Sequence, residues 1–219
     1  MPIIFELSNF DELLYNQSIT LITCFKVFSY DATTHMIFES SNSDEIRKQL
    51  GENKQLIPLW LSFSTGYELL FKAVLAKHKV LNITKGNVSK RKDTLLNCAS
   101  IDSILNVYHF IEGAQVSAKD DYIKGELRKL RITNLYDFST GQLGGSIGRL
   151  KKLLDQKMIS DDERAFLHDV TQTLLDLRRN VDAHTFYGLT VGKSINNDLD
   201  KLYLPAINLL LNVYYRPVL

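Results

Sequence analysis

The fold is decided most clearly by residues 161–184, which read DDERAFLHDVTQTLLDLRRNVDAH. The segment opens with three acidic residues, where the positive end of a helix dipole stabilises negative charge. Apolar residues then recur at steps of three and four, the spacing of one buried face of an α-helix. They are Leu167, Val170, Leu174, Leu177 and Val181, and His184 continues the series. The segment therefore predicts a long amphipathic helix that ends in a polar cluster.

The same helical spacing recurs elsewhere in the chain. The longest run of it covers residues 59–80 and includes Gly66, and shorter helices are predicted at 43–51, 101–112, 122–131 and 198–214. Residues 139–148 contain four glycines, but neither the Lys-Ser/Thr ending of a phosphate-binding loop nor a GxGxxG spacing is there. Leu143, Ile147, Leu150 and Leu154 continue through it at helical steps. We therefore expect a helix whose small residues allow close packing.

The first fifty residues have a different pattern. Ser8 to Asp11 resembles a helix start, with a short helix through Tyr15. Residues 18–30 and 33–39 are rich in β-branched and aromatic side chains, which predicts a hairpin or a pair of edge strands. The fold class expected is mainly α: an antiparallel helical bundle with a small N-terminal β-hairpin or strand-containing appendage. The predicted division is an α/β appendage at residues 1–50 and a helical domain at residues 51–219.

Length and composition are those of an ordinary soluble globule. The 219 residues are 45% hydrophobic and 23% charged, so a core can form without a disulfide or a metal ion. The N-terminus is acidic and lacks the apolar stretch of a signal peptide, and the apolar residues 202–219 are interrupted by Pro205 and Pro217. No membrane span is predicted. The two cysteines, Cys24 and Cys98, have no CxxC spacing, and the expected location is the reducing cytoplasm.

Charge is distributed unevenly along the chain. Residues 1–50 hold three basic and seven acidic side chains, a balance of −4, whereas residues 72–152 hold fifteen basic and seven acidic, a balance of +8. The second region includes the cluster Lys90, Arg91 and Lys92. Such a basic excess attracts a polyanion such as RNA. The alternative is a set of solvated lysines on helix surfaces and loops.

The histidines exclude some chemistry and single out one residue. None of the five lies in an HExxH motif or another metal-ligand spacing, and the GxSxG turn of a serine hydrolase is absent. No metal and no cofactor is predicted. His184 follows Arg178, Arg179 and Asn180 at the end of the apolar series, where burial is costly unless the polar groups pair with each other or with a ligand. The alternative is that Arg179 pairs with Asp176 or Asp182 while His184 caps the helix.

Residues 177–184, LRRNVDAH, resemble the signature of the HEPN superfamily. That signature is an arginine, a polar residue that is often asparagine, three further residues and a histidine, at the end of an apolar helix. Residues 66–73, GYELLFKA, resemble the family's early core helix, and residues 141–143 fit the same arrangement loosely. The resemblance covers roughly residues 57–215. Some HEPN toxins carry a tyrosine two residues after the histidine, where this chain has Phe186.

The resemblance implies metal-independent RNA cleavage in a toxin or antiviral-defence role, by a homodimer in which two copies of the motif meet. An antitoxin or another regulatory protein is an expected partner. RNA supplies its own nucleophile, the 2′-hydroxyl, so the protein needs only proton transfer and charge stabilisation. His184 would move the proton, Arg179 would grip the phosphate, and Asn180 would orient either group. Arg178 and the cluster at Lys90, Arg91 and Lys92 would bind substrate.

Two alternatives to the nuclease remain open. The first is a non-catalytic HEPN domain that binds RNA or protein as a scaffold, because a fold can persist without its chemistry. The second is a sensor or effector subunit whose N-terminal strands dock onto another protein. The presence together of Arg179, Asn180 and His184 favours the enzyme, since a scaffold needs no such set.

Overall fold

The computed structural model describes residues 10–52, 56–78, 80, 143–183 and 198–217. Within these residues the fold is mainly helical with one small antiparallel hairpin, as the sequence predicts. The expected helices at 101–112 and 122–131 lie outside the described residues. The elements are α1 (Phe10–Thr23), β1 (Phe28–Asp31), β2 (Met36–Glu39), α2 (Ser43–Glu52), α3 (Leu56–Lys77), α8 (Leu143–Asp155), α9 (Asp161–Ala183), the π-helical turn η2 (Leu199–Tyr203) and α11 (Leu204–Tyr215).

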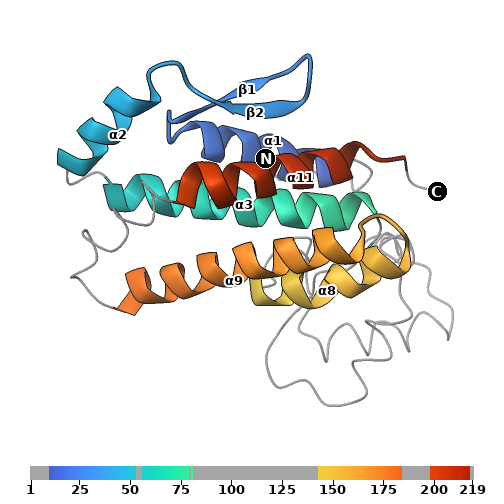
Figure 1. Cartoon of the computed structure of the whole chain (residues 1–219). Helices are drawn as coiled ribbons and strands as arrows, with labels where there is room; N and C mark the ends of the chain where they lie inside the picture. The colour runs from blue at the N-terminus through green and yellow to red at the C-terminus, as the bar shows by residue number, and fades with distance from the viewer. Residues whose placement is uncertain (1–9, 53–55, 79, 81–142, 184–197, 218–219) are drawn as a thin grey trace, which may run out of the picture.

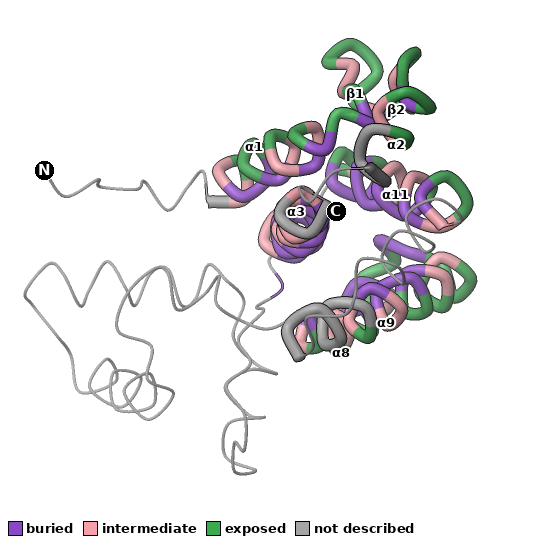
Figure 2. The backbone as a smooth tube through the Cα atoms, turned by 90° about the vertical axis from the view of Figure 1, so that its left-hand side faces the viewer, coloured by how far each residue is buried: buried purple, intermediate pink, exposed green. Residues whose placement is uncertain are grey.

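Helix α3 lies at the centre of the bundle. It packs against α1, α11, α8 and α9, and its side chains from Trp60 to Leu75 supply much of the core (Figures 1 and 2). Helices α1 and α9 run antiparallel to α3, whereas α11 runs alongside it in the same direction (Figure 1). A central helix of this kind is apolar around most of its circumference, which explains why residues 59–80 form the longest apolar run in the sequence.

Gly66 sets the distance between α1 and α3. A Cβ atom built on Gly66 would lie 2.9 Å from the backbone nitrogen of Ile22 and 2.9 Å from its Cγ1. Both distances are shorter than real Cβ contacts, so only glycine lets the two helix backbones come this close. The close approach buries Ile22 completely and joins α1 to the main core.

The β-rich stretch at residues 18–30 is only partly a strand. Residues 18–23 belong to α1, and β1 begins at Phe28. The expectation of strand there was wrong: residues 18–23 are helical, and three hydroxyl side chains bond back to carbonyls of the preceding helical turn. Ser18 Oγ donates to the Tyr15 carbonyl at 2.6 Å, and Thr23 Oγ1 donates to the Ile19 carbonyl at 2.8 Å. Thr20 Oγ1 donates to the Asn16 carbonyl in the same way. Packing on α3 then overrides the weak local preference of β-branched residues.

The hairpin lies over α1 and α11 at one side of the bundle (Figure 1). Strands β1 and β2 pair with Phe28 opposite Glu39 and Tyr30 opposite Ile37. Arg47 on α2 forms two ion pairs. One joins it to Glu39 at the end of β2, at 2.8 Å, and the other joins it to Asp200 of η2, at 2.5 Å. The hairpin residues Phe28 and Ile37 share one hydrophobic cluster with the helices. The domain boundary at residue 50 stays a prediction.

Helix α11 closes the core with the apolar residues that the sequence assigns to a terminal core helix. Its buried side chains include Ile207, Leu210 and Leu211. Among the described helices, none combines the length and the apolar character that crossing a membrane requires.

Candidate functional site

Helix α9 carries the candidate motif, and its first turn is anchored on both sides. Ser160 and Glu163 form a capping box: the Ser160 backbone N–H donates to Glu163 Oε2 at 2.8 Å, and the Glu163 N–H donates to Ser160 Oγ at 3.2 Å. Arg216, which follows α11, donates to Glu163 Oε1 at 2.7 Å and to the carbonyl of Met158. Its hydrogen bond lowers the pKa of Glu163 below the usual value. The start of α9 is therefore fixed to the end of α11.

The apolar face of α9 is buried as the sequence spacing predicts. Leu167, Val170 and Leu174 are all at most 2% exposed. Between them, Thr171 Oγ1 lies 3.0 Å from the hydroxyl of Tyr67 on α3. This buried hydrogen bond sets the axial position of α9 relative to α3. The pair ties the signature helix to the segment GYELLFKA, the two parts of the sequence that carry the family resemblance.

Arg178, Arg179 and Asn180 lie on the last turns of α9, which continues as an unbroken helix to Ala183. Consecutive helical positions differ by about 100°, so the backbone directs Arg179 and Asn180 to different sides. His184 comes directly after the described part of α9, and Lys90, Arg91 and Lys92 lie outside the described residues. The structure thus brings Arg178, Arg179 and Asn180 onto one helix end, whereas it does not describe their meeting with the other four predicted residues.

The N-terminus of α8 approaches α9 shortly before the motif. A Cβ atom on Gly144 would be 3.9 Å from Cδ1 of Leu175, which precedes Arg179 by four residues. The first turn of α8 contains Gly144 and Gly145 and no acidic side chain. The positive end of the α8 dipole therefore lies near the turn of α9 that precedes Arg179, where it favours a bound anion.

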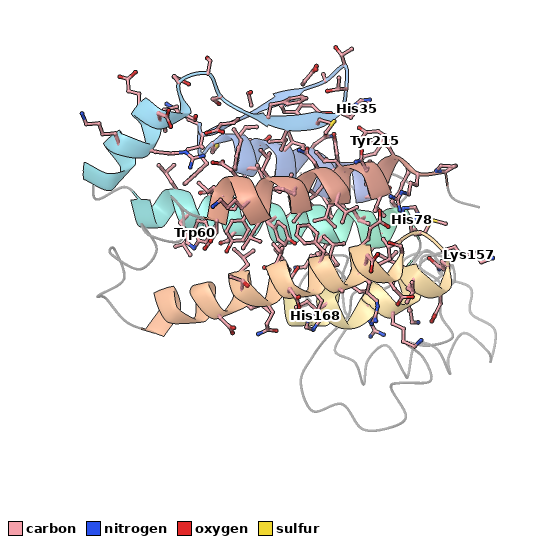
Figure 3. The ribbon with its side chains drawn as sticks, viewed as in Figure 1. His35, Trp60, His78, Lys157, His168 and Tyr215 are labelled. Atoms are coloured by element: carbon pink, nitrogen blue, oxygen red, sulfur yellow. The ribbon has the colours of Figure 1, made fainter. Side chains whose placement is uncertain are left out.

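A fully buried aromatic group lies near the start of α3, where Figure 3 labels Trp60. The rings of Trp60 and Phe63 stack with centroids 5.4 Å apart, and Tyr203 meets both rings edge-on. Tyr203 belongs to the π-helical turn η2, a geometry found most often as single turns near functional sites. No spacing in the sequence predicts this group, although Trp60 is the chain's single tryptophan.

Helix α3 also contains a buried ion pair that the sequence analysis did not single out as a pair. Lys72 Nζ lies 2.7 Å from Glu68 Oε1, and the two residues are 6% and 9% exposed. The signal in the sequence was the i, i+4 spacing of opposite charges within an apolar run. Replacing a buried ion pair by apolar residues is often neutral or stabilising. The presence of this pair is therefore weak evidence that it stabilises the fold. Glu68 and Lys72 lie within the GYELLFKA segment.

A cluster of tyrosine hydroxyls and one histidine lies at the end of the bundle opposite to Trp60, where the hairpin meets α1 and α11 (Figure 3). The Tyr15 hydroxyl lies 2.6 Å from that of Tyr30 and accepts from Tyr215 at 3.1 Å. His35 stacks on Tyr215 with ring centroids 4.1 Å apart. Burial, followed by the hydrogen bonds with Tyr215 and Tyr30, raises the pKa of Tyr15. No spacing in the sequence signals this group, because its members come from four separate elements.

Within the described residues, no group of three or more histidine, cysteine, aspartate or glutamate side chains is arranged to hold a metal ion. Comparisons of the chain with models of protein families, with curated proteins and with solved structures give no match.

Proposed function

We propose that the chain is a metal-independent endoribonuclease of HEPN type that acts as a homodimer, in a toxin or antiviral-defence role. The observation that carries the proposal is the position of Arg179 and Asn180 at the end of α9, five and four residues before His184. The apolar face of the same helix is buried against the bundle through Leu174. A polar group at the end of a packed helix suits a site that meets a second copy of the chain.

The proposed reaction uses the residue types of this helix end. The 2′-hydroxyl attacks the adjacent phosphorus, and the bond to the 5′-oxygen of the next nucleotide breaks. His184 of one protomer accepts the 2′-proton, and the same residue of the other protomer protonates the leaving 5′-oxygen. Arg179 stabilises the charge on the phosphate, and Asn180 orients the histidine or the phosphate. The products are a 2′,3′-cyclic phosphate and a 5′-hydroxyl.

One structural observation supports an anion near this place. The N-terminus of α8 lies against Leu175, one turn of α9 before Arg179, and a helix dipole is positive at that end. The buried pair of Tyr67 and Thr171 sets the position of α9 along α3 about two turns before Arg179.

The test is RNA cleavage in the presence of EDTA by the wild-type protein and by two variants. Arg179→Ala and His184→Ala should each reduce cleavage by about 10²-fold or more, since proton transfer and charge stabilisation each contribute that much. Lys48→Ala, an exposed position on α2, is the matched control and should cut like the wild type. Circular dichroism and the oligomeric state should be unchanged in all three variants.

The ends of the products decide the mechanism. Products with 5′-hydroxyl and cyclic phosphate ends support the proposal, whereas 5′-phosphate ends that require a divalent metal contradict it. A wild-type protein that binds RNA without cutting it would point instead to a non-catalytic HEPN domain that acts as an RNA-binding scaffold.

A further inference from the structure

Helices α8 and α9 lie on the side of the molecule away from the hairpin (Figure 1), and side chains of both helices line a groove. It has a volume of about 500 Å³. Small residues leave its floor open: a Cβ atom on Gly148 would meet nothing within 4 Å, and Ala165 faces it from α9. Ile147 and Leu150 supply an apolar wall.

Three basic side chains line this groove. Lys151 comes from α8, and Arg164 and His168 come from successive turns of α9 (Figure 3 labels His168). One acidic side chain, Asp169, also lines it. Among the lining residues, Lys151 and Arg164 therefore carry permanent positive charges and Asp169 carries a negative charge.

The basic side chains are held only by weak neighbours on their own helices. Lys151 lies 3.3 Å from Asp155, Arg164 lies 3.5 Å from Asp161, and His168 lies 3.1 Å from Asp169. All six side chains are at least 44% exposed. Exposed ion pairs of this kind contribute little to stability, so a phosphate can compete with these carboxylates for the basic side chains.

The groove and position 179 lie on one face of α9. Position 179 follows position 168 by eleven residues. Eleven residues make about three full turns, so the two positions point the same way and lie roughly 16 Å apart along the helix axis. Leu175 lies between positions 168 and 179 on α9 and is close to Gly144 at the N-terminus of α8. This terminus bounds the groove on the side of Arg179. The acidic first turn of α9 bounds it on the other side.

We propose that this groove binds the sugar-phosphate backbone of the RNA substrate a few nucleotides away from the scissile bond, with Lys151 and Arg164 as phosphate ligands. The inference rests on the proposed function, because it names how that site holds its substrate. The apolar wall and the open floor leave room for a ribose, and the mixed charge limits the contact to a short stretch of backbone. The groove thus sets the direction in which RNA crosses α9.

The test measures binding separately from cleavage. The probe is a short fluorescein-labelled single-stranded oligoribonucleotide with 2′-O-methyl groups, which lacks the attacking hydroxyl and cannot be cut. Binding of the full-length chain is followed by fluorescence anisotropy over a salt titration. The variant Lys151→Gln/Arg164→Gln should bind less tightly, and the slope of log K against log salt should fall by about 1.4, since each phosphate contact on a single strand contributes about 0.7.

Two controls separate charge from structure. Lys151→Arg/Arg164→Lys keeps both charges and should keep the wild-type salt slope. Lys48→Gln removes an exposed charge on α2 and should bind like the wild type. Suppose that the Lys151→Gln/Arg164→Gln variant keeps the wild-type slope of log K against log salt while the wild-type protein cuts RNA. The proposal that the groove binds RNA would then be wrong, and the proposal of a nuclease would stand. Suppose instead that the wild-type protein binds the probe but cuts no RNA, and that the Lys151→Gln/Arg164→Gln variant binds the probe less tightly. This result would support RNA binding in the groove and would contradict the nuclease. Absence of any RNA binding would overturn both.

Discussion

The side-chain amide of Asn208 on α11 binds both backbone groups of Ile37 on β2. Its Oδ1 accepts from the Ile37 N–H at 2.9 Å, and its Nδ2 donates to the Ile37 carbonyl at 2.9 Å. An amide side chain presents the same donor and acceptor pair as a neighbouring strand. Asn208 therefore takes the place of a third strand at the outer edge of β2, and it protects an edge that would otherwise be open to pairing.

Replacing Asn208 should destabilise the fold. Asn208→Ala removes two hydrogen bonds and leaves two partly buried backbone groups without protein partners, which costs about 1–3 kcal/mol. Asn212→Ala, one turn later on the exposed side of α11, is the matched control and should change stability by less than about 0.5 kcal/mol. Urea unfolding followed by circular dichroism measures both. Equal midpoints for the two variants would show that the edge contact adds nothing.

Two glycines should respond to alanine in opposite directions. Gly66→Ala forces a Cβ atom against the backbone of Ile22, and the overpacking should cost about 1–3 kcal/mol. Gly148→Ala places its Cβ in open space on an exposed helix position, so it should stabilise α8 by up to about 1 kcal/mol. Thermal unfolding of the two variants gives the sign of each effect. A Gly66→Ala protein as stable as the wild type would contradict the close approach of α1 and α3.

The sequence predicts the helices of the described bundle better than it predicts its edges. Periodicity locates α3, α8, α9 and α11 because one face of each is buried, and burial leaves a repeating apolar pattern. It fails at residues 18–23, where the hydroxyls of Ser18 and Thr23 satisfy the helix backbone and packing on Gly66 decides the conformation. For the candidate site, the sequence supplies the order Arg179, Asn180, His184, which places the first two on one helix end. The pair of Tyr67 and Thr171, which positions the middle of α9 against α3, joins residues 104 apart and has no local signal in the sequence.

Acidification should destabilise the protein first through His78. This residue is buried, and its Nε2 donates to the Val213 carbonyl at 2.7 Å. Burial lowers its pKa below the usual 6.5, with smaller contributions from the charges of Lys77 and Arg216. A lowered histidine pKa means that the folded state binds the proton less tightly than the unfolded state, so stability falls as the pH drops below about 6.5. His78→Gln should flatten this part of the stability–pH curve; an identical slope would contradict the assignment.

Glu163 should give a second acid transition at lower pH. The hydrogen bond from Arg216 lowers its pKa below 4.5, so the unfolded state takes up the proton first as the pH falls. Its contribution to stability is present above pH 4.5 and is lost as the pH drops through the folded pKa. Glu163→Gln should lose this dependence, whereas Asp162→Asn on the exposed side of the same turn serves as the control. The difference in unfolding free energy between wild type and Glu163→Gln should narrow toward acid; a constant difference would sink the prediction.

Mixed dimers test whether two copies of His184 act together. If one supplies the base and the other the acid, a dimer with a single intact copy is inactive. Exchange of equal amounts of wild-type and His184→Ala protein should leave about one quarter of the dimers active, rather than the half of the sites expected for independent protomers. The measurement is the initial rate of RNA cleavage after subunit exchange. A rate proportional to the wild-type fraction would show that each protomer carries a complete site.

The contacts that hold the hairpin side of the molecule join distant parts of the chain. Ile37 and Asn208 are 171 residues apart, Asp11 and Tyr214 are 203 apart, and Arg47 and Asp200 are 153 apart. Contacts of such long sequence separation form late in folding, although the entropy of closing the loop grows only slowly with its length. In a chain whose α11 has not docked, the outer edge of β2 lacks the cover that Asn208 provides. Docking of this one helix therefore removes an edge through which two chains could pair.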